Sequence, residues 1–264
     1  MRAYIDGPEG QIHYQMFGRG MPLILCHQAP TCSVQFQEVL QPLADRGFRA
    51  IAIDNPGFGM SDGPSTPPSI ERDYLNATMA VMDALQIERA HIVGHHTGSM
   101  LAVEAANRYP RRFDKVVLHG PLLLEPEERP QWRANMVPKE EELGIPSADG
   151  SHIIEAWNWR ASHAQQMTAV AAVNRHILWQ AMAGETSWYG HHACFNYDQV
   201  AAVRQLQQPC LMLTNTGDLV HDIASRIRMI RPDINVVEFE GGSMDYIDEY
   251  PEQWIEAVSA FLNH

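Results

Sequence analysis

The chain has 264 residues, of which 45% are hydrophobic, so it is long enough for one large domain, or two small ones, with a sizeable core. Its formal net charge of −13 argues against nucleic acid as a partner. The start, MRAYIDGPEGQIHYQ, lacks the pattern of a secretion signal, and no apolar run approaches the roughly 18 residues that cross a bilayer. We therefore expect a soluble, cytoplasmic protein with no membrane partner.

Strands and helices alternate through the first 120 residues. A buried strand is expected at 22–27, an amphipathic helix at 33–47 and a strand at 48–55. A loop rich in Pro and Gly follows, and then a helix at 70–87. A strand at 90–95 runs directly into another helix, and a further strand is expected at 115–120. This alternation is typical of a mostly parallel sheet.

The pattern changes between residues 121 and 200, where no strand is evident. Strands return at 209–217 and 234–242, and a last helix is expected at 251–262. The insertion begins just after the carboxyl end of a strand, where α/β sheets bind ligands. We therefore expect a helical cap at 121–200 on a core domain that consists of 1–120 and 201–264.

Three motifs lie in this order along the strands. They are HQAP at 27–30, DNPGFGMSD at 54–62 and GHHTG at 94–98. Together they resemble the loop after the first buried strand, the D-x-PG-x-G-x-S loop and the nucleophile elbow of the α/β-hydrolase superfamily. The resemblance covers nearly the whole chain. It implies a mostly parallel eight-stranded sheet flanked by helices, with the cap inserted after the sixth strand.

The resemblance also assigns positions to a catalytic triad, with two of the three residues replaced. The tip of the elbow, where the family usually has serine, is His96. The acid position after a late strand is Asp218, and counting back seven residues from Pro251 places Met244 at the usual histidine. Ser99 is near the tip in sequence but belongs to the following helix, so it is not expected to be the nucleophile.

An imidazole at the elbow reaches about 2 Å further than a serine hydroxyl. Met244 is unbranched and flexible, so it leaves room for that ring. We therefore expect His96 to approach Asp218, with one ring nitrogen held by the carboxylate, directly or through a water, and the other facing substrate. In that position His96 serves as a general base or as a direct nucleophile. The alternatives are an inert His96, and an Asp218 that only caps a helix.

The resemblance assigns an oxyanion hole, a pair of donors that stabilises a negatively charged oxygen, to two backbone N–H groups. They belong to Thr97, directly after the tip, and to Ala29, after the first buried strand. Gln28 stands where glycine is usual and is expected to add its amide to the pocket. Backbone donors survive side-chain replacement, so the hole is expected to be more intact than the triad.

Five side chains are candidates for substrate binding. They are His27, Gln28, Met244, Trp157 and His192. The alternative for His27 is to orient its own loop, and the alternative for Trp157 is to pack the cap onto the sheet.

No metal and no cofactor is predicted. The adjacent cap histidines at 191 and 192 point in different directions on regular structure, with no carboxylate at a typical ligand spacing. The cysteines show no paired spacing of a disulfide framework or zinc site, and two of them fall in apolar runs expected in the core. The four are Cys26, Cys32, Cys194 and Cys210.

These features indicate an enzyme that acts on a small carbonyl-containing molecule, such as an ester, lactone, thioester or diketone. Its reaction is hydrolysis or C–C cleavage, with elimination and isomerisation left open. One alternative is a non-catalytic ligand-binding protein on a degenerate hydrolase scaffold. Another is a conventional esterase with a different nucleophile, such as Cys32. The sequence leaves the substrate open, and it leaves the assembly open between a monomer and a homodimer.

Overall fold

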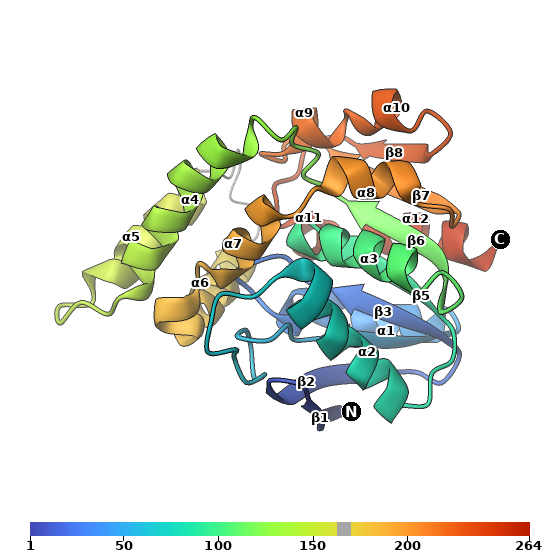
Figure 1. Ribbon diagram of the computed structural model, residues 1–264, viewed down its shortest axis with the longest axis horizontal. Helices are drawn as coiled ribbons and strands as arrows, with labels where there is room; N and C mark the ends of the chain where they lie inside the picture. Colours follow the sequence, from blue (N-terminus) through green and yellow to red (C-terminus); the bar gives the residue numbers. More distant parts are fainter. Residues whose placement is uncertain (163–169) are drawn as a thin grey trace.

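A computed structural model describes residues 1–162 and 170–264. An eight-stranded sheet forms the centre, in the order β1-β2-β4-β3-β5-β6-β7-β8 (Figure 1). The pairs β1·β2 and β2·β4 are antiparallel, and the other neighbouring strands are parallel, which confirms the mostly parallel sheet. The strands are Arg2–Gly7 (β1), Gly10–Phe17 (β2), Met21–Cys26 (β3), Phe48–Ile53 (β4), Ala90–His95 (β5), Phe113–His119 (β6), Cys210–Asn215 (β7) and Asn235–Phe239 (β8).

Successive side chains along a strand point to opposite faces of the sheet, and each face packs on its own helices. Ile24 of β3 belongs to the core on one face, whereas Leu23 and Leu25 belong to the core on the other. Helices α2, α3 and α8 cover the first face, and α1, α11 and α12 cover the second (Figure 1). The helices of the core are Gln37–Asp45 (α1), Leu75–Ala84 (α2), Thr97–Arg108 (α3), Gln199–Gln205 (α8), His221–Ala224 (α9), Ile227–Ile230 (α10), Tyr246–Glu249 (α11) and Pro251–Asn263 (α12).

Two expected helices begin in a different helical form. The helix expected at 33–47 starts as a 3₁₀ turn, Ser33–Phe36 (η1), before α1. The helix expected at 70–87 starts as a π-helical turn, Ile70–Tyr74 (η2), before α2. The sequence also did not locate β1 and β2 individually. The residues of β1 alternate only between exposed and half-buried, so this strand lacks the apolar signal of a core strand.

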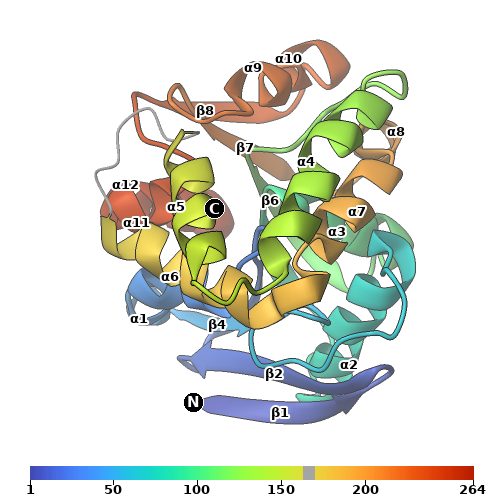
Figure 2. The same ribbon diagram turned by 90° about the vertical axis from the view of Figure 1, so that its left-hand side faces the viewer.

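In the described residues five α-helices lie between β6 and β7, and we call the first four of them the cap. They are Arg129–Gly144 (α4), Ser151–Ser162 (α5), Val170–Ala183 (α6) and Tyr189–Asn196 (α7), with a short 3₁₀ turn at Gly184–Thr186 (η3). Figure 2 shows these helices side by side in front of the sheet. The helical insertion after the sixth strand is therefore confirmed. The boundary expected at residue 200 falls inside α8, whose Val200 and Val203 pack in the core.

Within 1–162 and 170–264, none of the helices combines the length and the apolar character that a bilayer crossing requires.

Candidate active site

His96 lies at a tight turn between β5 and α3, with φ 47° and ψ −113°. Residues other than glycine rarely adopt a positive φ, so this turn stores backbone strain. Two glycines make the turn sterically feasible. A Cβ on Gly94 would lie 2.1 Å from the Gly98 carbonyl oxygen, and a Cβ on Gly98 would lie 2.1 Å from the Cys26 carbonyl oxygen. The sequence GHHTG thus holds His96 above the end of β5.

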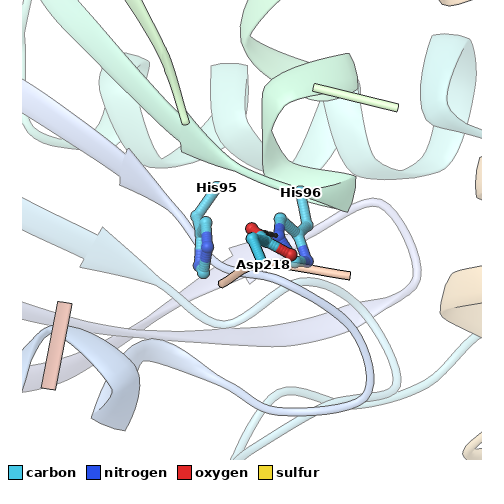
Figure 3. Close-up of side chains that lie close together, drawn as sticks. All are labelled: His95, His96 and Asp218. Carbon is cyan, nitrogen blue, oxygen red and sulfur yellow. Dashed lines mark hydrogen bonds and ion pairs between the residues drawn. The ribbon is translucent and has the colours of Figure 1, made fainter. Parts of the chain in front are cut away.

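The contact expected between His96 and Asp218 is present. The Nε2 atom of His96 lies 2.8 Å from Oδ2 of Asp218, in the loop after β7 (Figure 3). Oδ1 of Asp218 accepts a hydrogen bond of 3.1 Å from the backbone N–H of Val220. The carboxylate therefore orients the ring through Nε2. In the described residues Nδ1 of His96 has no protein partner, so it is the nitrogen available to a ligand.

Asp218 is buried, yet it is held as a carboxylate. Burial raises the pKa of this carboxyl, but the opposing effects of His96, the Val220 N–H and His119 outweigh it and lower the pKa below its ordinary value. The ion therefore persists at neutral pH and favours a proton on Nε2 of His96.

His95 and His119 are fully buried beside His96, at ring-centroid distances of 4.3 Å between His95 and His96 and 4.6 Å between His95 and His119. Burial holds the pKa of His95 well below its ordinary value and lowers the pKa of His119 to about 4. Both rings are thus neutral at neutral pH. Nδ1 of His119 accepts a hydrogen bond of 3.2 Å from Trp254, which places its proton on Nε2 toward Asn215.

His95, His96 and Asp218 also have their ligand atoms within 4.8 Å of one another, a spacing that suits a metal ion (Figure 3). The hydrogen bonds of Gln35 oppose that use. Its Oε1 accepts the Gln28 N–H at 3.0 Å, so its NH₂ group faces Nδ1 of His95 and donates to it. The proton of the neutral His95 ring is then on Nε2, which is buried without a partner and has no lone pair for a metal. These residues do not fit a metal ligand set.

A cavity of about 80 Å³ lies between these groups and the cap. The loops after β3, β5, β6, β7 and β8 form its core side, and the cap covers it. The core side includes Gln28, Ala29, Pro30, His96, Thr97, Gly120, Leu219, Val220 and Met244, and the cap side includes Trp132, Met136, Glu140, Trp159, Arg160, His176, Gln180, His191, Cys194 and Phe195. The predicted Gln28, Met244, His96 and both backbone donor residues are thus brought together.

Ala29 and Thr97 retain free backbone donors in the described part of the chain. Their N–H groups have no acceptor there, and both residues line the cavity. An unpaired N–H at a cavity wall is suited to a developing negative charge on a ligand oxygen. Gln28 is oriented by its Nε2 hydrogen bond of 3.5 Å to the Met244 carbonyl oxygen. Met244 itself follows β8 and presents a thioether, which does not transfer protons.

The structure corrects three of the expected cavity contacts. His27 is 1% exposed and is absent from the cavity wall, because Nδ1 bonds the Gln28 carbonyl oxygen and Nε2 accepts the Asn55 N–H. Trp157 packs against an apolar cluster inside the cap, and His192 lies 3.3 Å from Arg133. His27 is thus held within its own loop, Trp157 packs inside the cap, and His192 contacts Arg133.

Other nucleophiles that the sequence offers are sequestered. Cys32 is fully buried, and burial raises the pKa of its thiol far above neutrality, with a further increase from Asp54. Ser99 is fully buried in α3, where its hydroxyl donates to the His96 carbonyl oxygen at 2.5 Å and accepts from Gln199 at 2.8 Å. All four cysteines are free and buried, as expected for Cys26 and Cys210.

Most residues of the polar cap wall were not predicted from the sequence. Arg160 is 9% exposed, with Nη2 2.5 Å from Oδ1 of Asp245 and Nε buried without a partner. Glu140 pairs with His191, and His176 and Gln180 are buried beside the cavity. These residues come from four separate helices with no shared motif. The only available signal was the His-His pair, and there the inner histidine, His191, faces the cavity.

Comparison with known proteins gives the same architecture. The family description "alpha/beta hydrolase fold" matches residues 21–141. The bromoperoxidase of Bacillus anthracis superposes with a TM-score of 0.83 and 18% identity, covering 100% of both chains. The enol-lactonase of Burkholderia xenovorans has a TM-score of 0.78 and 19% identity, covering 99% of this chain and 100% of the other. The chain has the α/β-hydrolase fold.

Within this α/β-hydrolase fold, curated relatives resemble only part of the chain. The 2-hydroxy-6-oxo-6-phenylhexa-2,4-dienoate hydrolase of Comamonas testosteroni is 36% identical over 115 residues, which are 42% of this chain and 40% of that protein. The chain thus spans well under half the length of this relative. The segment matched by the family, 21–141, contains His96, Thr97 and Ala29 but ends before Asp218.

Proposed function

We propose that this protein is an enzyme that hydrolyses a small carbonyl-containing molecule, with His96 as general base and Asp218 as its orienting acid. The observation that carries the proposal is the 2.8 Å bond between His96 Nε2 and a buried carboxylate at the wall of a cavity. The bond leaves Nδ1 free on the ring, as a base requires. The named relatives, which include an oxo-dienoate hydrolase and an enol-lactonase, support a carbonyl substrate.

The reaction proceeds by activation of water. Nδ1 of His96 takes a proton from a water molecule as its oxygen attacks the carbonyl carbon. The charge on the imidazolium is balanced by Asp218, and the charge on the carbonyl oxygen by the N–H groups of Ala29 and Thr97. Collapse of the intermediate expels an alkoxide, an enolate or a thiolate. Direct attack by His96 is the variant of this route, in which an acyl-imidazole forms and is hydrolysed.

A substrate panel with three variants tests this assignment. We expect wild-type protein to hydrolyse at least one class among esters, lactones, thioesters and β-diketones. We expect His96→Ala to lose at least about a thousandfold in kcat/KM, because base, orientation and charge stabilisation are lost together. Ser99→Ala and Cys32→Ala should keep most of the rate, since both side chains are sequestered.

Labelling gives an independent check on the nucleophile. A fluorophosphonate modifies activated serines, so wild-type protein should remain unlabelled. Stoichiometric labelling of Ser99, or an undiminished rate in His96→Ala, would overturn the proposal. A wild-type protein that binds panel compounds without turnover would instead establish the ligand-binding alternative.

A further inference from the structure

A second imidazole–carboxylate pair lies in the cap wall of the same cavity. Nδ1 of His191, on α7, lies 2.7 Å and 2.8 Å from the two carboxylate oxygens of Glu140, on α4. Glu140 is 3% exposed. Both side chains line the cavity that His96 lines from the core. The site thus has a histidine held by a buried carboxylate on each of two sides.

The hydrogen bonds of this pair fix the role of each ring nitrogen. An ionised carboxylate only accepts hydrogen bonds, so Nδ1 of His191 carries a proton. Nε2 on the other side of the ring has no protein partner among the described residues. The ring also stacks on Phe195, at 5.7 Å between centroids and 17° between planes. These two contacts therefore fix the orientation of the His191 ring, and its Nε2 atom is available to a ligand.

Helix α7, which carries His191, contacts α3, the helix that directly follows His96. Cys194, three residues after His191 on α7, lines the same cavity as Thr97, the residue next to His96. The cap pair and the turn at His96 therefore line one cavity, and the helices α7 and α3 that adjoin them are in contact.

A purely structural link between α4 and α7 does not require this arrangement. The rings of Trp132 on α4 and Phe195 on α7 already pack together, with 6.4 Å between their centroids. The Ser187 hydroxyl, just before α7, also donates to the Glu140 carbonyl oxygen. A buried carboxylate next to a cavity carries a desolvation cost that an apolar pair would avoid. A titratable pair at such a position is suited to proton transfer.

We propose that His191, held by Glu140, is the general acid that protonates the leaving group. This inference rests on the proposed function. His96 Nδ1 takes one proton from water, and the hydroxide oxygen forms a bond to the carbonyl carbon. His191 acts in its imidazolium form, with one proton on Nδ1 toward Glu140 and one on Nε2. As the bond from that carbon to the leaving atom breaks, its electron pair stays on the leaving atom, which takes the Nε2 proton and leaves His191 neutral. The product acid and solvent then return both rings to their starting states, so one water is consumed for one acid and one protonated leaving group.

Leaving-group dependence distinguishes this role from a structural one. We expect His191→Gln to lose about a hundredfold in kcat on a substrate with a poorly acidic leaving group, and less than about threefold on an activated aryl ester. The alkaline limb of the wild-type pH profile should disappear in the variant, because that limb reports the acid. Glu140→Gln should show the same pattern more weakly, because Glu140 acts by positioning His191.

His192→Gln is the matched control, because this neighbour on α7 bonds Arg133 and is absent from the cavity wall. Its rates should match the wild type on both substrates. An equal loss on both substrates in His191→Gln, or no loss, would overturn the inference. If His191→Gln proves unfolded by circular dichroism, His191→Asn and Glu140→Gln decide in its place. Full activity in His96→Ala would instead overturn the proposed function, so the two failures differ.

Discussion

The two histidine–carboxylate pairs of this cavity are alike in chemistry and different in construction. The histidine side chains are each 17% exposed, and the carboxylate side chains of Asp218 and Glu140 are 0% and 4% exposed. The core pair bonds at 2.8 Å through Nε2, whereas the cap pair bonds at 2.7 Å through Nδ1. His96 sits on a strained turn with positive φ, but His191 sits on a regular helix.

Because of this difference, we expect the core pair to be held more rigidly than the cap pair. The backbone at GHHTG holds His96 in place, because the close contacts at Gly94 and Gly98 leave the turn little freedom. The place of His191 depends instead on how α4 and α7 pack. Changes in cap packing should therefore alter the acid and the choice of substrate, while the base stays fixed.

The largest contrast is expected from matched carboxylate changes. Asp218→Asn should lower kcat on a poor leaving group by several hundredfold, because the amide no longer stabilises the imidazolium of His96. Glu140→Gln should lower it by only about tenfold, since an acid that is poorly positioned still donates. Steady-state kinetics of both variants measures the ratio. Equal losses of kcat in the two variants would contradict the different roles of the His96 and His191 pairs.

We expect His119, on the core side of the cavity, to make the free energy of unfolding fall at low pH. His119 has a pKa of about 4 in the folded protein, against 6.5 as its ordinary value. Its contribution to stability is therefore complete above pH 6.5 and is lost as the pH falls through 4, because the unfolded chain takes up the proton first. Between pH 7 and 4, wild type should lose about 3 kcal/mol more of its unfolding free energy than His119→Gln. Urea denaturation at the two pH values measures this, and parallel losses would contradict it.

Metal removal should have the smallest effect. The hydrogen bonds of Gln35 place a proton on the His95 nitrogen that would have to bind an ion. Dialysis against a strong chelator should therefore leave the kcat and the melting temperature unchanged. A loss of activity that added zinc restores would show that His95 adopts the other tautomer and that the core pair is a metal site.

The sequence predicted the core side well because backbone requirements appear in short motifs. Glycines spaced around His96 indicate a strand-turn-helix, and the resemblance to the α/β-hydrolase superfamily assigned the acid to Asp218, after a late strand. The strand order then brings together residues that are 122 positions apart. None of this required knowledge of side-chain packing.

The cap side could not be predicted in the same way. Glu140 and His191 are 51 positions apart on two helices whose relative rotation depends on tertiary packing. Helical spacing alone did not show that His191 faces the cavity while His192 turns outward to Arg133. Trp157 and Trp159 both pack against the apolar cluster of the cap, but of the two only Trp159 also lines the cavity. Pairings between helices of an insertion carry no local signature.

Chemical rescue of His96→Gly tests the central claim most directly. Glycine accepts a positive φ without strain, so the variant should fold and leave space for an imidazole beside Asp218. We expect this variant to be inactive in buffer and to regain activity with added imidazole, saturably and by about tenfold or more. Wild-type activity of His96→Gly without imidazole would contradict the account, because the base would then reside elsewhere.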